Sequence, residues 1–348
     1  MPERPAGFAP PPPALVEDGH QHLGRFDGPP RRANLLDARY RGLPRSLRRW
    51  RLKEWQAVQL ATPRLFANLA LFDARLMTLL QAKVYDRARG LKHVHERTLR
   101  PGAFRLADQL LDSTNRYQDR RGRLGFHNQV AAGRIEVDLD LPATGGAPRL
   151  AGRLVLHVDR GASQVVSLPF ATAGGMYSHK GMFPVEGELV VGDEHHRLTP
   201  TTALALLDDH KGYYPYVMRW DWVTTATFDG AGRALGLNLT HNQCREPERH
   251  NENCAWIDDR IGRLPAVTFT RLRVREPDEL WQIRDAAGRV DLTFAPTVPG
   301  EVRVNALVVE SRYRGPFGTL RGRIEPEGLP AIDVDDWFGM GEEFWLRC

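Results

Sequence analysis

The stretch Ile135-Glu-Val-Asp-Leu-Asp140 places apolar and acidic side chains at alternate positions. Successive side chains of a β-strand point to opposite faces of its sheet, so this period of two predicts a strand with one buried face. Similar strand-like runs follow along the rest of the chain, at 154–158, 190–191, 223–228, 235–239, 267–274, 302–309 and 320–324. A chain dominated by such short runs is predicted to be all-β.

Turn-forming residues separate these runs at short intervals. Turns containing glycine are predicted at 143–146, 229–232, 286–288, 299–300 and 327–328. Strands joined by such turns form antiparallel hairpins, and many hairpins in succession are typical of a sandwich or a closed barrel, which also protects the strand edges. We therefore expect antiparallel barrel-like sheets with only a few short helices.

The length of the chain, 348 residues, exceeds what one hydrophobic core usually serves, so two domains or one double-barrelled unit are expected. Residues 1–30 are rich in proline and are expected to form a disordered tail. We expect an N-terminal barrel-like half at 31–185 and a C-terminal half at 186–348. Helices are expected at Pro44–Ala57, Pro101–Leu111 and Pro200–Leu207, whereas 58–85 fits either a helix or two buried strands.

A net charge of +5 arises from 48 basic residues interspersed with 43 acidic ones. The clearest basic stretch is Arg41–Lys53, which contains Trp50, and a solvated face explains it at least as well as a phosphate-binding track. We expect no nucleic-acid partner, because no recognised nucleic-acid-binding motif accompanies the charge.

The location of the protein is expected to be cytoplasmic. Three cysteines cannot build a disulfide framework, and no apolar leader opens the chain. No apolar run approaches the ~20 residues that span a bilayer, so no transmembrane segment is expected and only peripheral membrane contact stays open. The sequence leaves the oligomeric state open.

The segment Asp208–Trp222 combines acidic residues and a histidine with a group of aromatic residues. The candidates for proton transfer are Asp209 and His210, expected in a turn, together with Asp221. The candidates for ligand binding are Tyr214, Tyr216, Trp220, Trp222, Asn238 and Trp256. Strand alternation predicts Trp220 and Trp222 on one face and Asp221 on the other. Two interpretations stay open: a pocket for an apolar ligand, or ordinary core beside an acidic turn.

A second unusual segment carries four residues that bind metals in other proteins: His241, Cys244, His250 and Cys254. Two imidazoles and two thiolates suit tetrahedral zinc, but their spacing is not that of a standard finger or ribbon. A histidine-rich loop with unpaired thiols is the favoured interpretation, so we expect neither a metal nor another cofactor. Four asparagines of this region, at 238, 242, 251 and 253, are expected to hydrogen-bond either their own backbone or a ligand.

The segment Gly174–Gly181 is bounded by glycines and carries His179 and Lys180. It lacks the strand-to-helix context of a phosphate loop, so an ordered loop is expected there. The sequence also lacks a Gly-x-Ser-x-Gly elbow, a His-Glu-x-x-His zinc helix and a dinucleotide fingerprint. An enzyme built on this chain is therefore expected to use acid–base chemistry by Asp209 and His210 in an apolar pocket.

Several short motifs, in this order, resemble a largely bacterial family catalogued as domain of unknown function 2804. They are Leu52-Lys-Glu-Trp55, Tyr214-Pro-Tyr216 with Trp220-Asp-Trp222, Leu237-Asn-Leu239, Asn253 with Trp256, Val290-Asp-Leu-Thr-Phe-Ala-Pro296 and Phe317-Gly-Thr-Leu-Arg-Gly322. The resemblance extends over about Asn34–Trp345. That family is in turn distantly similar to AttH-type and carotenoid-hydratase-like proteins, which implies two packed lipocalin-like (calycin) β-barrels and an apolar cavity.

The resemblance and the residues together predict a binder of a hydrophobic small molecule, a lipid or an isoprenoid, in an aromatic cavity. In the hydratases the same fold implies proton addition across an isoprenoid double bond, so an enzyme of the hydratase, isomerase or cyclase type is the alternative. The turn at Asp209 and His210 and the strand Trp220–Trp222 match their pocket positions. A non-catalytic structural or interaction protein is the third alternative.

Overall fold

The computed structural model describes residues 7–40, 44–170, 174–275, 278–306 and 309–347. The chain divides into two compact units. The N-terminal unit comprises Ala9–Ser167 and Met176–Tyr213, and the C-terminal unit comprises Met1–Phe8, Leu168–Gly175 and Tyr214–Cys348. Each unit is built around an antiparallel sheet, so the expected all-β class with two barrel-like halves is confirmed.

The helices of the described residues are few and short. They are the α-helix α1 (Arg45–Arg51) and the 3-10 helices η1 (Leu35–Asp37), η2 (Val130–Ala132) and η3 (Val158–Arg160). Among the helices described, none is both long and apolar enough to cross a membrane.

The sheet of the N-terminal unit contains thirteen strands among the described residues. A separate pair, β1 (Val16–Glu17) and β2 (His20–Gln21), precedes it. The strands of the large sheet are β3 (Gly24–Phe26), β4 (Leu52–Ala61), β5 (Leu65–Asp73), β6 (Thr78–Asp86), β7 (Leu91–Leu99), β8 (Ser113–Asp119), β9 (Gly122–Gln129), β10 (Arg134–Leu141), β11 (Leu150–His157), β12 (Ala162–Pro169), β13 (Gly175–Val191), β14 (Glu194–Leu198) and β15 (Leu204–Tyr213).

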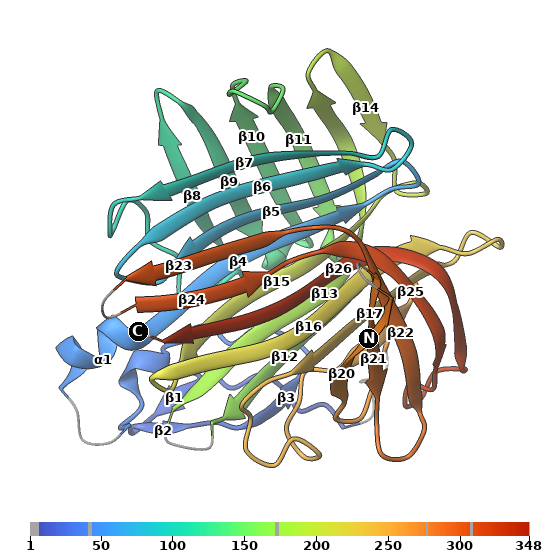
Figure 1. Cartoon of the computed structure of the whole chain (residues 1–348). Coiled ribbons are helices and arrows are strands. Elements are labelled where there is room, and N and C mark those ends of the chain that lie inside the picture. The colour runs from blue at the N-terminus through green and yellow to red at the C-terminus, as the bar shows by residue number, and fades with distance from the viewer. Residues whose placement is uncertain (1–6, 41–43, 171–173, 276–277, 307–308, 348) are drawn as a thin grey trace. The chain divides into compact units, whose positions relative to one another are not determined.

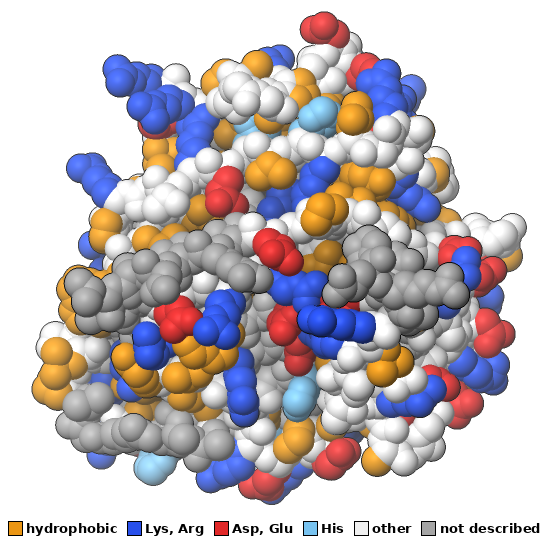
Figure 2. Space-filling model, in the orientation of Figure 1, with side chains coloured by type: hydrophobic (Ala, Val, Ile, Leu, Met, Phe, Trp, Pro, Cys, Tyr) orange, Lys and Arg blue, Asp and Glu red, His pale blue; other side chains and the backbone are white. Residues whose placement is uncertain are grey.

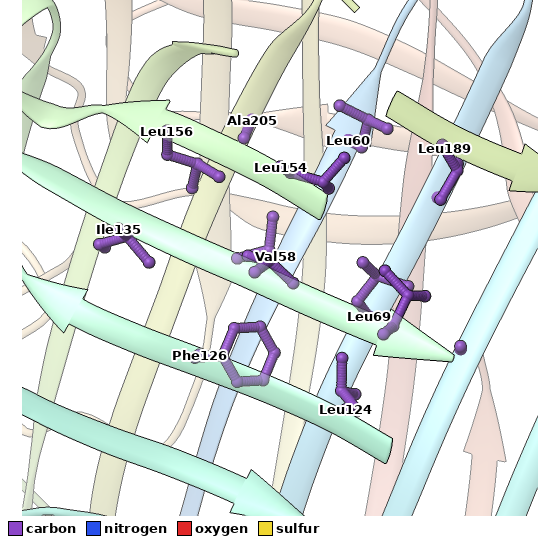
Figure 3. Close-up of a cluster of buried hydrophobic side chains, with 14 of the residues drawn as sticks. Val58, Leu60, Leu69, Leu124, Phe126, Ile135, Leu154, Leu156, Leu189 and Ala205 are labelled. Atoms are coloured by element: carbon purple, nitrogen blue, oxygen red, sulfur yellow. The ribbon is translucent and has the colours of Figure 1, made fainter. Parts of the chain in front are cut away.

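The order of the main strands in this sheet is β7-β6-β5-β4-β15-β13-β11-β10-β9-β8. The central strands β15 and β13 therefore connect two antiparallel arms, β4–β7 and β8–β11, which cross one another in Figure 1. Inward-facing apolar side chains of the arms meet in one core, to which Val58 and Leu69 contribute from one arm and Phe126 and Leu154 from the other. Figure 3 shows these side chains pointing toward one another. The strand alternation of the sequence thus produces a curled sheet whose concave side is filled.

A second apolar cluster lies in the same unit, where the N-terminal segment covers β12, β13 and β15. Its buried members are Leu15, Phe26, Ala33, Leu35, Leu52, Val165, Tyr177 and Tyr213. The strand β3 pairs with β12, joining this early part of the chain to the large sheet. Residues 9–30 are therefore folded, which differs from the disordered tail expected at 1–30; residues 1–6 of that tail lie outside the described part of the chain.

The sheet of the C-terminal unit contains eleven strands among the described residues. They are β16 (Val217–Phe228), β17 (Ala234–His241), β18 (Cys254–Ile257), β19 (Arg260–Arg263), β20 (Thr268–Arg275), β21 (Asp278–Arg284), β22 (Val290–Val298), β23 (Glu301–Ala306), β24 (Val309–Arg314), β25 (Phe317–Ile324) and β26 (Ile332–Arg347). Its core contains Val223, Leu237, Trp281 and Phe294.

Three helix predictions differ from the structure. The helix expected at Pro44–Ala57 ends at Arg51, because Leu52–Ala61 pairs with β5 and β15 as strand β4. The segment Pro101–Leu111 contains no helix, and Pro200–Leu207 is a short turn followed by the start of β15. The ambiguous segment 58–85 forms strands, since its apolar residues face the core with a period of two.

The division between the units also differs from the expected boundary at 185/186. Both β13 and β15 belong to the sheet of the N-terminal unit, so this unit continues to Tyr213. The C-terminal sheet begins with β16 immediately afterwards.

Candidate functional site

The strand β15 carries charged residues through the middle of the N-terminal sheet. All ten of its residues are buried, and it lies between β4 and β13. Ala205 and Leu207 belong to the core on the concave side, so strand alternation places Asp209 and Lys211 on that side and Asp208 and His210 on the other. The turn expected at Asp209 and His210 is therefore a continuous strand, and these two neighbours lie on opposite faces of the sheet.

Asp209 is 1% exposed and accepts a hydrogen bond from the hydroxyl of Tyr177 on β13. Its Oδ1 atom has no hydrogen-bond partner among the described residues. Burial disfavours the charged carboxylate and raises the pKa of Asp209 to about 7, against the lowering effect of the Lys211 ammonium. At neutral pH this group therefore populates both its acid and its carboxylate form.

The imidazole of His179 lies two residues beyond Tyr177 on the same face of β13. It is fully buried, and neither ring nitrogen has a hydrogen-bond partner within the described chain. Burial lowers the pKa of His179 to about 4, so the ring is neutral at physiological pH. The loop expected at Gly174–Gly181 is thus a buried strand from Gly175 onward. Two of its polar side chains, Tyr177 and His179, are site residues that sequence reasoning missed.

The amide of Gln56 lies directly across from Asp209 in the pairing of β4 with β15. Its two polar atoms are already engaged, because Oε1 accepts from Asn115 at 2.6 Å and Nε2 donates to Asn128 at 2.7 Å. The amide of Gln56 is therefore not a partner of the unpartnered oxygen of Asp209.

Lys211 and Glu54 form an ion pair of 2.8 Å, with side chains 1% and 4% exposed. The guanidinium of Arg75 binds the other oxygen of Glu54 and also binds Asp73 at 2.8 Å. Burial lowers the pKa of Lys211, and nearby acidic groups counteract that effect. Because each charge in this group has a partner of opposite sign, we assign the group a structural role.

The opposite face of β15 holds a separate set of contacts. Asp208 accepts from the ammonium of Lys180 at 2.6 Å and from the indole of Trp55 at 3.0 Å. The ring of His210 stacks on the same indole. Burial and the nearby ammonium groups of Lys180 and Lys211 lower the pKa of His210 well below its usual value. His210 is therefore neutral and separated from Asp209 by the sheet itself.

Asp221, the third candidate for proton transfer, belongs to the C-terminal unit and forms an ion pair with Arg271. That guanidinium also lies 3.9 Å from the ring centroid of Trp281. The predicted alternation of Asp221 with Trp220 and Trp222 along β16 agrees with the strand geometry. The structure thus does not bring Asp221 together with Asp209 in one described unit.

The aromatic candidates of the C-terminal unit differ in their surroundings. The indole of Trp222 donates to Asn238 at 2.7 Å, and Trp256 is 1% exposed, so these three residues make internal contacts. The indole of Trp220 donates to Glu342 at 3.1 Å and packs on the ring of Phe344. Tyr214 is buried beside Phe170, whereas Tyr216 is 57% exposed.

The loop between β17 and β18 holds two of the four metal candidates, Cys244 and His250, whereas His241 ends β17 and Cys254 begins β18. Among the described residues, no group of three His, Cys, Asp or Glu side chains is arranged to hold a metal ion. His241 is exposed, and burial raises the pKa of Cys244 to about 12, which disfavours its thiolate. The asparagines bond backbone atoms: Asn253, for example, accepts from the amide of Thr240 at 2.7 Å and donates to the carbonyl of Pro265 at 2.8 Å. The ligand-binding alternative stays a prediction.

A groove of about 340 Å³ lies elsewhere on the N-terminal unit, and none of the predicted site residues lines it. Its lining includes Asp86, Arg89, His93, Glu194 and His196. Leu65, Leu91, Pro148 and Val191 also line it. Glu194 is paired with Arg64 at 2.6 Å, so the groove combines apolar side chains with an ion-paired rim.

Comparisons with known proteins give the family of the chain. One similar solved structure is that of kievitone hydratase from Nectria haematococca, with 12% sequence identity, a TM-score of 0.48, and coverage of 85% of this chain and 88% of that chain. No curated protein sequence matches the chain. The family model described as "Domain of unknown function (DUF2804)" matches residues 14–347. Because this match spans almost the whole chain, the protein belongs to the DUF2804 family.

Proposed function

We propose that the protein binds a hydrophobic small molecule, a lipid or an isoprenoid, inside the N-terminal unit. The observation that carries the proposal is a set of buried polar atoms without partners in the described chain: Asp209 Oδ1, both ring nitrogens of His179 and the hydroxyl of Tyr213. Buried polar atoms normally have hydrogen-bond partners, so unpartnered atoms on the adjacent strands β13 and β15 support a ligand that carries a hydroxyl or carbonyl group.

The surroundings of these atoms support an apolar ligand. Tyr177 and Tyr213 belong to the apolar cluster that also contains Leu15, Phe26 and Val165. Small-molecule sites are lined mostly by apolar and aromatic side chains, with a few polar groups that fix the orientation of the ligand. The ligand-binding roles predicted for Tyr214, Tyr216 and Trp220 stay predictions. A cytoplasmic location is part of the proposal, since neither of the two described cysteines, Cys244 and Cys254, takes part in a disulfide.

Retinol, a fluorescent isoprenoid alcohol, tests the binding proposal. We expect saturable binding with one site per chain, and the D209L variant should bind about tenfold more weakly because one buried hydrogen bond is lost. The matched control is D336N, which changes a carboxylate of the C-terminal unit with a side chain 54% exposed and should bind as the unaltered protein does. Unsaturable binding that is equal in all three proteins would contradict the proposal.

A second candidate function is proton transfer to or from such a ligand, with Asp209 as the acid or base. It is favoured by the pKa of about 7 for Asp209 and by the adjacent Tyr177 hydroxyl. His210 is left out of this candidate, because it lies across the sheet.

Deuterium uptake distinguishes the two functions. The bound compound is extracted from the natural protein, returned to the protein in deuterated water and examined by mass spectrometry. An enzyme should introduce deuterium at carbon, and D209N should retain affinity but lose at least about a hundredfold in rate. A binder should leave the compound undeuterated.

A further inference from the structure

The helix α1 is strongly basic and lies on the surface of the N-terminal unit. Its seven residues, Arg45–Arg51, include four arginines and no acidic residue, and none of the seven is buried. Leu47 and Trp50 are each 55% exposed, which is unusual for large apolar side chains. Hydrophobic and basic side chains lie side by side at the lower left of Figure 2, in the region where Figure 1 labels α1.

The helical period separates two sides of α1. Leu47 and Trp50 are three positions apart, so they lie on neighbouring parts of one side. Arg48 and Arg51 are the least exposed residues of the helix, and the Arg51 guanidinium lies 5.5 Å from the ring centroid of Tyr213. Since Arg48 and Arg51 face the unit, the helical geometry turns Trp50 and Arg49 toward solvent together.

A neighbouring turn extends this apolar surface. The ammonium of Lys53 donates both to the carbonyl of Trp50 at 3.3 Å and to the carbonyl of Ala74 at 2.9 Å. These bonds hold the turn after β5 beside the end of α1, and Leu76 of that turn is 50% exposed. We define the α1 patch as Arg45, Leu47, Arg49, Trp50 and Leu76.

We propose that the α1 patch docks on a lipid surface that contains anionic headgroups. Arginines beside a tryptophan and leucines on one exposed surface combine phosphate-binding groups with side chains that insert at the headgroup boundary. Charge complementarity favours an anionic surface. Arg45 pairs with Asp37, whereas no ion pair to Arg48 or Arg49 occurs among the described residues, so the positive charge of α1 is not neutralised by ion pairs within that part of the chain. The inference is independent of the proposed ligand site, since it uses none of its residues.

Co-sedimentation with lipid vesicles tests the proposal on the full chain. Vesicles of phosphatidylcholine with one quarter phosphatidylglycerol should retain the protein at low salt, whereas pure phosphatidylcholine vesicles should retain much less. The L47S/W50S variant should partition at least about tenfold more weakly, because two apolar side chains no longer enter the interface. R49Q should partition about fivefold more weakly, and raised salt should weaken binding of the unaltered protein.

Two controls keep the test informative. L91S changes a side chain that is 48% exposed on β7, outside the α1 patch, and should partition as the unaltered protein does. Thermal unfolding of L47S/W50S should be unchanged, since no residue of α1 is buried. Equal partitioning on both kinds of vesicle, or full retention of L47S/W50S, would overturn the proposal. Salt-dependent binding to duplex DNA that R49Q weakens, without binding to anionic vesicles, would assign the patch to nucleic acid instead.

Discussion

The imidazole of His210 and the indole of Trp55 are stacked with ring centroids 3.8 Å apart and planes 7° from parallel. The two residues face each other across the paired strands β15 and β4. This stack holds His210 on the face of the sheet opposite Asp209, although the two are neighbours in sequence. Adjacent residues of a strand cannot share a ligand on one face.

The H210F variant should therefore retain retinol binding, because phenylalanine can keep the stack on Trp55 while Asp209 is untouched. The affinity is measured by retinol fluorescence beside that of D209L. A loss of affinity in H210F as large as that in D209L would contradict the separation of the two residues.

His179 should make the protein less stable as the pH falls from about 6.5 to about 4. The folded pKa of about 4 lies below the usual value of 6.5, so in this window the unfolded chain takes up a proton that the folded protein excludes. The loss amounts to about 3 kcal/mol. Urea unfolding at several pH values should show this loss of stability between pH 6.5 and pH 4 in the unaltered protein and not in H179F. Identical pH dependence in the two proteins would argue against a buried neutral imidazole.

Asp209 should make the protein less stable as the pH rises, which is the opposite of the effect of His179. Its folded pKa of about 7 lies above the usual value of 3.8. The contribution of the protonated carboxyl group to the free energy of unfolding is therefore complete below about pH 4 and is lost as the pH rises through 7. The free energy of unfolding lost over this range is about 4 kcal/mol. D209N should consequently gain stability relative to the unaltered protein between pH 4 and pH 8, as measured by urea unfolding. If the free energies of unfolding of the two proteins differ by the same amount at every pH in this range, Asp209 has an ordinary pKa.

The buried ion pair of Lys211 and Glu54 should be sensitive to loss of one partner. K211M removes one charge and leaves Glu54 with Arg75 alone, whereas E54Q leaves the buried Lys211 ammonium without its carboxylate. We expect E54Q to lower the free energy of unfolding by about 3–5 kcal/mol, with a smaller loss in K211M. The exposed pair Arg321 and Asp336 provides the control, and D336N should be indistinguishable from the unaltered protein. Equal, small effects in all three variants would contradict a buried network.

The sequence predicted the strands whose two faces differ. In Ile135–Leu141 apolar residues alternate with acidic ones, and the structure has Ile135, Val137 and Leu139 in the core of the N-terminal unit. The alternation is informative because one face of this strand is buried and the other carries charges that meet arginines such as Arg153.

Strands buried on both faces were harder to predict. Leu204–Leu207 is apolar throughout, so a helix after Thr199-Pro200 was as consistent with the sequence as a strand. Asp209 and His210 were expected in a turn, although the neighbouring Asp208 and Lys211 are buried with them in β15. Their partners, Glu54 and Lys180, come from β4 and β13, and pairing between segments so distant in sequence is not encoded in a local pattern.

The site residues were predicted in part for the same reason. Asp209 was recognised from its position beside His210 and the aromatic segment. Tyr177 and His179 were not, since glycines around them indicated a loop, and only the adjacency of β13 to β15 brings Tyr177 to Asp209.

Native mass spectrometry of the protein purified from its own host tests the central proposal most directly. The proposal predicts a stoichiometric mass increment that is removed by organic extraction and identified as an apolar compound with a hydroxyl or carbonyl group. The D209L variant should carry less of it, and D336N should carry the same amount. A compact protein without any bound compound, in both the unaltered chain and the variants, would contradict a ligand site in the interior of the N-terminal unit.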